Sequence, residues 1–149
     1  MSGDGAKDDL LTQNLNASMA IWLSARIEDE LRDFIISRMV RSNRDSRKRL
    51  FEGYGPLSSF SAKIEIAYAF GMLTDIERSY MLAIKAIRNK FAHSSGGLTF
   101  DSPAFDELFA KLPGSFTQTV RREIYIEIAV RCLASMDGQK VRSIADLYS

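Results

Sequence analysis

Apolar residues recur at helical spacing along almost the whole chain, and this periodicity restricts the fold more than any other feature of the sequence. From residue 15 they follow one another mostly at steps of three or four, which marks one face of a long helix. These residues are Leu15, Met19, Trp22, Leu23, Ile27, Leu31, Phe34, Ile35 and Met39. The pattern predicts a helix over about residues 15–41 with this stripe turned inward.

Start and stop signals divide the rest of the chain into further helices. Ser58 or Ser59 can cap a helix after the Gly53–Pro56 turn. Thr74 and Glu77 have capping-box spacing, and the helix that they open should end near His93, before Ser94–Gly97. A short helix is expected from Ser102-Pro103 to about Leu112, and a long one from about Phe116 to Met136, with Val120, Ile124, Ile128 and Leu133 inward and Gly138 ending it.

These signals predict an all-α fold, a single-domain bundle of about five helices. Its length suits one domain. We expect a flexible N-terminal segment over residues 1–14, a helical domain over 15–138 and a C-terminal tail over 139–149, with room for one more turn at Ile144–Tyr148.

Charge and composition exclude several functional classes. The 20 basic and 19 acidic residues give a net charge of +1, so any nucleic-acid site must be local. The single cysteine, Cys132, lies in an apolar stretch and is predicted to be a buried small side chain. No signal peptide or membrane-length apolar run is visible, which predicts a cytoplasmic protein without a membrane partner.

The segment Arg88-Asn-Lys-Phe-Ala-His93 carries the residues with most chemical potential. Asn89 and His93 are four apart on one helix and therefore share a face. An imidazole can move the proton of a ribose hydroxyl, and a guanidinium can hold phosphate oxygens, so these groups suit metal-independent cleavage of RNA. A structural alternative is that His93 bonds the last carbonyls of its helix and Arg88 pairs with Asp75, Glu77 or an acid of the first helix.

Cleavage needs both an acid and a base, so this reading predicts a homodimer in which the two Arg88–His93 helices face each other. One histidine, one cysteine and no carboxylate cluster at ligand spacing predict no metal site, and we expect no cofactor.

Three stretches resemble the mannitol operon repressor family within the wider HEPN class: Tyr54-Gly-Pro-Leu-Ser-Ser-Phe-Ser-Ala-Lys-Ile64, Ala67-Tyr-Ala-Phe-Gly71 and Ile87-Arg-Asn-Lys-Phe-Ala-His93. The resemblance covers roughly residues 15–135 and includes the first helix, with Trp22-Leu23 and Ile27–Leu31. It implies an all-helical protein that acts in transcriptional repression of sugar-alcohol uptake genes. HEPN membership also implies Arg88, Asn89 and His93 as the residues of a dimeric ribonuclease, although many members of that class only bind.

No helix-turn-helix is recognisable, so repression would need another route. The strongest basic segment contains Arg41, Arg44, Arg47, Lys48 and Arg49 against Asp45 alone. It is the candidate nucleic-acid site, with a solvated helix end and loop as its structural alternative.

Three functions remain open on this sequence. The first is a regulatory protein of the mannitol-repressor type that binds DNA, RNA or a protein partner. The second is a HEPN-type endoribonuclease, and the third is an interaction module without enzymatic activity; we favour the first, and whether the chain is an enzyme stays open.

Overall fold

The computed structural model describes residues 3–147, with side chains through residue 139, and this part of the chain is helical without any strand. The elements are α1 (Gly3–Ser37), α2 (Arg44–Phe51), α3 (Phe60–Ala69), α4 (Asp75–His93), the 3-10 helix η1 (Pro103–Phe105), α5 (Asp106–Ala110) and α6 (Arg121–Leu147). The predicted all-α bundle is confirmed, with one α-helix more than expected. None of the described helices is long and apolar enough to cross a membrane.

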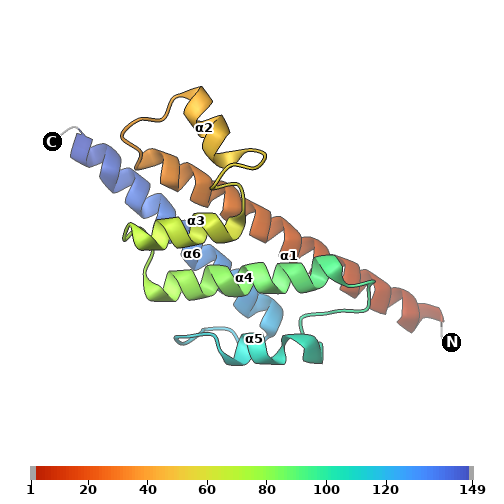
Figure 1. Ribbon diagram of the computed structural model, residues 1–149. Coiled ribbons are helices and arrows are strands. Elements are labelled where there is room, and N and C mark those ends of the chain that lie inside the picture. The colour runs from red at the N-terminus through yellow and green to blue at the C-terminus, as the bar shows by residue number, and fades with distance from the viewer. Residues whose placement is uncertain (1–2, 148–149) are drawn as a thin grey trace.

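Helix α1 is the axis of the fold, and it packs against α3, α4 and α6 (Figure 1). Helix α4 also contacts α3, α5 and α6, and the most extensive packing of α1 is against α6 and α4. Helix α2 lies apart from this bundle, beside the C-terminal half of α1 (Figure 1). The N-terminal end of α1 extends beyond the other helices (Figure 1).

The core lies between α1, α4 and α6 and is closed by aromatic rings. Phe91 packs against Phe100 and Phe105 with ring centroids 5.1 and 4.7 Å apart, and Phe100 packs against Tyr125 at 5.1 Å. Two hydrogen bonds tie this cluster to α1: the Tyr125 hydroxyl donates to the carbonyl of Ala20 at 2.7 Å, and the amide of Phe100 donates to Asn16 Oδ1 at 3.0 Å. The cluster fixes the C-terminal end of α4, where His93 lies.

Several predicted helix starts and stops are confirmed. Ser59 caps α3 by accepting the amide of Ala62 at 3.1 Å. Thr74 and Glu77 form both bonds of the capping box that begins α4, and α4 ends at His93 as expected. Cys132 is fully buried, also as predicted.

Other expectations about the helices were wrong. Helix α1 spans Gly3–Ser37 rather than about 15–41, and two members of its expected inward stripe, Leu15 and Trp22, are 66% and 65% exposed. The last helix starts at Arg121 and continues through Gly138 to Leu147, so Val120 lies outside it and is 54% exposed. Interior glycine costs only about 1 kcal/mol in a helix, which a long helix tolerates. Tyr148 lies outside the described residues.

Candidate nucleic-acid interface and the Arg88–His93 segment

Residues 44–49 of the basic segment lie on α2, whereas residues 41–43 precede it. Asn43 caps α2 by accepting the amide of Ser46 at 2.8 Å, and Lys48 and Arg49 lie in its last turn, where the helix dipole favours cations. Phe51 is buried and fastens the end of α2 to the bundle. The helix therefore presents its basic residues from a fixed backbone.

Three of these residues share a pocket with a residue of α1. Arg44, Arg47 and Lys48 line a pocket of about 280 Å³ together with Arg32 and Glu52. Four cations and one carboxylate give this lining a net charge of +3, in a chain whose total is +1. Such a concentration of positive charge in a concave surface attracts phosphate groups.

The contacts of these arginines hold the pocket in shape. The Arg32 guanidinium lies 5.2 Å from the centroid of the Phe51 ring, which joins α1 to α2, and its Nη1 is 3.5 Å from Asp33. Arg47 Nη1 donates a hydrogen bond to the carbonyl of Ser42, just before α2. Arg44 and Lys48 make no ion pair among the described residues and are exposed.

Not every predicted basic residue joins this pocket. Arg41 precedes α2, Arg49 lies on it, and both are exposed without lining the pocket. Sequence reasoning missed Arg32, which looked like one of several charges on the solvated face of the first helix. Recognising Asn43 as a helix cap and Phe51 as an anchor would have brought α2 against that face.

Arg88, Asn89 and His93 lie on the last turns of α4. No hydrogen bond or ion pair connects them among the described residues. His93 is exposed, whereas Arg88 is half-buried. Burial raises the pKa of the Tyr125 hydroxyl, and the positive charge of the nearby Arg88 offsets part of that rise. Arg88 is thus directed toward the packing of α4 on α6, and His93 toward solvent.

The structure contradicts the structural alternatives for His93 and for pairing of Arg88 with Asp75 or Glu77, whereas pairing with an acid of the first helix stays a prediction. Ser94, and not His93, caps the end of α4 by donating to the carbonyl of Phe91 at 3.0 Å. Asp75 accepts the Tyr68 hydroxyl, and Glu77 accepts Ser135 as well as closing its capping box, so neither pairs with Arg88. Arg88 Nε is buried without a hydrogen-bond partner.

Two further surfaces are apolar. Leu11, Leu15 and Trp22 are exposed along one face of α1. Near the opposite end of α1 a pocket of about 450 Å³ is lined by Ile35, Arg38, Met39, Leu57, Ile66, Phe70 and Met72.

Among the described residues no group of three or more histidine, cysteine or carboxylate side chains is placed to hold a metal ion.

One of three comparisons with known proteins finds a match, and that match has a similar architecture. No protein-family model matches the chain, and no curated protein sequence matches it. Among solved structures, the X-ray structure of the MtlR–HPr complex from Escherichia coli matches with a TM-score of 0.51 at 16% identity, over 95% of this chain and 94% of that one. The chain therefore has an MtlR-like fold.

Proposed function

We propose that this protein is a regulator of the mannitol operon repressor type that acts in transcriptional repression by binding nucleic acid at the α1–α2 pocket. The observation that carries the proposal is the convergence of Arg32, Arg44, Arg47 and Lys48 on one concave surface. Three of these cations, Arg44, Arg47 and Lys48, have no acidic partner among the described residues, so their charges are available to phosphates. The recognition is electrostatic and needs no helix-turn-helix.

The pocket determines what kind of binding is expected. A single phosphate group fits a polar pocket of about 280 Å³, and neighbouring phosphates of the same strand can reach the exposed Arg41 and Arg49. Contacts of this kind position a nucleic acid without reading its sequence. We therefore expect affinity that falls steeply with salt and depends little on base sequence.

The test is fluorescence anisotropy of a labelled duplex DNA and of a labelled single-stranded RNA. Replacing Arg44, Arg47 and Lys48 together by Ser should lower the affinity at least about tenfold at low salt. A control in which the exposed Lys90, Lys111 and Arg122 become Ser removes the same charge elsewhere and should retain binding. Equal affinities of the two triple variants would refute the pocket as the site.

A protein partner is the second candidate target. The matched solved structure is a complex of MtlR with HPr, and here Leu11, Leu15 and Trp22 form an exposed apolar face on α1. Trp22 is the only tryptophan and is 65% exposed, so a partner that covers this face should shift its fluorescence to shorter wavelength. Titration with purified HPr should produce that shift; unchanged emission and no binding heat would argue against this partner.

The ribonuclease alternative depends on a dimer, because one chain supplies a single histidine where cleavage needs both an acid and a base. The unpartnered Arg88 Nε is the observation that favours it. Light scattering at micromolar concentration should then give twice the 16.7 kDa of one chain. A mass equal to that of one chain would refute the model in which two copies share one catalytic site.

A further inference from the structure

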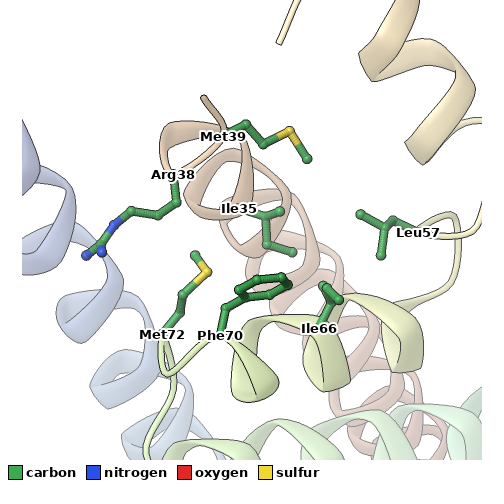
Figure 2. A pocket seen from close by; sticks show the side chains of 7 residues that line it. All are labelled: Ile35, Arg38, Met39, Leu57, Ile66, Phe70 and Met72. Carbon is green, nitrogen blue, oxygen red and sulfur yellow. The ribbon is translucent and has the colours of Figure 1, made fainter. Parts of the chain in front are cut away.

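The apolar pocket at the C-terminal end of α1 has a composition that the proposed nucleic-acid site does not explain. Six of its seven lining side chains are apolar, and the seventh is Arg38 (Figure 2). Its volume of about 450 Å³ is that of a small-molecule site, and such sites combine apolar walls with few polar groups. Two of the walls are Met39 and Met72, whose flexible thioethers adapt to different ligand shapes.

The pocket is held open by a fixed turn. Phe70 ends α3 and is 75% exposed although its side chain is large and apolar. The amide of Gly71 bonds to Tyr68 and that of Met72 to Ala67, both at 2.9 Å, and Gly71 has a φ of 71°. This left-handed conformation suits glycine, so the turn presents Phe70 at the mouth of the pocket. Covering its ring would remove apolar surface from water.

Arg38 supplies the only charge of the lining. It lies at one edge and extends away from the apolar side chains (Figure 2). Its guanidinium lies 5.4 Å from the centroid of the Phe34 ring, and it has no acidic partner among the described residues. A cation that has no counter-charge among the described residues, beside an apolar pocket, favours a ligand with an apolar body and one anionic end.

We propose that this pocket binds a small amphipathic carboxylate, with the hydrocarbon body against Ile35, Ile66 and Phe70 and the carboxylate at Arg38. The chain enters the α2 segment after Met39 and returns from it at Leu57, and both residues line the pocket. A bound ligand therefore joins the two connections that hold α2. Such a ligand would thereby influence nucleic-acid binding at α2. This influence rests on the proposed function, whereas the binding of the carboxylate does not.

Calorimetric titration of the full chain with decanoate tests the site, with decanol as the uncharged probe. Decanoate should bind more tightly than decanol. Arg38→Gln should weaken decanoate about tenfold and leave decanol unchanged. Arg122→Gln, which changes an exposed arginine on α6 outside the pocket, is the matched control and should have no effect. Phe70→Ala, at an exposed position with little cost in folding, should weaken both probes.

Three results would overturn the proposal: no decanoate binding, equal affinity for decanoate and decanol, or decanoate binding that Arg38→Gln leaves unchanged. Amide hydrogen exchange measures the effect on α2 separately. Saturating decanoate should slow exchange over residues 44–51, and unaltered exchange would contradict the link to α2. Neither readout uses nucleic acid, so failure of the proposed function leaves both interpretable.

Discussion

Lys63 on α3 is the buried charged residue of the described chain, at 4% exposure. Its Nζ donates to Glu28 Oε1 of α1 at 3.0 Å and to the carbonyl of Ser58 at 3.1 Å. Both acceptors would lose a partner if the ammonium were removed. Because Glu28 retains some solvent contact, the loss should be smaller than for a fully buried ion pair.

We therefore expect Lys63→Met to lower the free energy of unfolding by about 2 kcal/mol, measured by urea denaturation. Lys111→Met is the control, since Lys111 and Glu107 are 72% and 78% exposed and such pairs contribute little. Similar losses of unfolding free energy in the two variants would show that the ion pair between α1 and α3 stabilises the fold no more than the exposed one does.

Cys132 provides a second test at this scale. The side chain is fully buried, and burial, followed by the charge of Glu77, raises the pKa of its thiol to about 12. The thiolate is the reactive form, and it is essentially absent at pH 8. An aromatic disulfide reagent should leave the folded protein unmodified over hours and titrate one thiol in denaturant. Rapid modification of folded protein would contradict this packing.

His93 and Arg88 give the third prediction. Since one points to solvent and the other toward Tyr125, we expect wild type to cleave a structured RNA pool in EDTA no faster than His93→Ala. Cleavage by wild type alone would establish the ribonuclease alternative and displace the binding proposal.

Side-chain environments were only partly predictable from the sequence. The buried state of Cys132 followed from its apolar neighbours. The burial of Lys63 did not, because a lysine in a helix pattern is ordinarily solvated and its partner Glu28 is 35 positions away in the chain. Trp22 was assigned to the core because its spacing fitted the stripe, yet it is 65% exposed while its neighbours Ala20 and Leu23 are buried, so it lies on the outer face of α1.

At the scale of elements, α2 depends on the turn that follows it. A Cβ on Gly55 would lie 2.4 Å from the carbonyl oxygen of Arg49 and 2.5 Å from that of Leu50. Backbone atoms cannot move aside cheaply, so Gly55→Ala should displace the end of α2. We expect a loss of about 2 kcal/mol in unfolding free energy together with weaker nucleic-acid binding.

Gly138→Ala is the matched substitution. Gly138 lies inside α6 with open space around its Cβ position, so alanine should stabilise the protein by up to about 1 kcal/mol. In thermal unfolding, Gly55→Ala should lower the midpoint temperature and Gly138→Ala should raise it. A Gly55→Ala variant as stable as wild type would mean that the turn does not hold α2.

Two capped helix starts were predicted correctly, at Ser59 for α3 and at Thr74 with Glu77 for α4, whereas the Asn43 cap of α2 was missed. Helix α2 was missed because its eight residues are mostly charged and show no apolar period. The extension of α6 past Gly138 was missed because a glycine stops a helix only where the chain also turns. The predicted division into residues 1–14, 15–138 and 139–149 stays a prediction.

At the scale of the whole molecule, the all-α fold followed from periodicity, and the MtlR-like arrangement agrees with the resemblance seen in the sequence. The site was less predictable. Arg44, Arg47 and Lys48 were candidates from charge alone, but the pocket exists because α2 packs beside α1 and brings them to Arg32. That long-range contact is invisible to local spacing.

Arg32 therefore offers the most direct test of the account. Anisotropy titrations of labelled duplex DNA over a range of salt concentrations should show weaker binding for Arg32→Met and a salt slope smaller by about one. Arg26→Met, which removes another α1 arginine outside the pocket, should match wild type in affinity and slope. Identical behaviour of the two variants would contradict the claim that the α1–α2 pocket binds nucleic-acid phosphates.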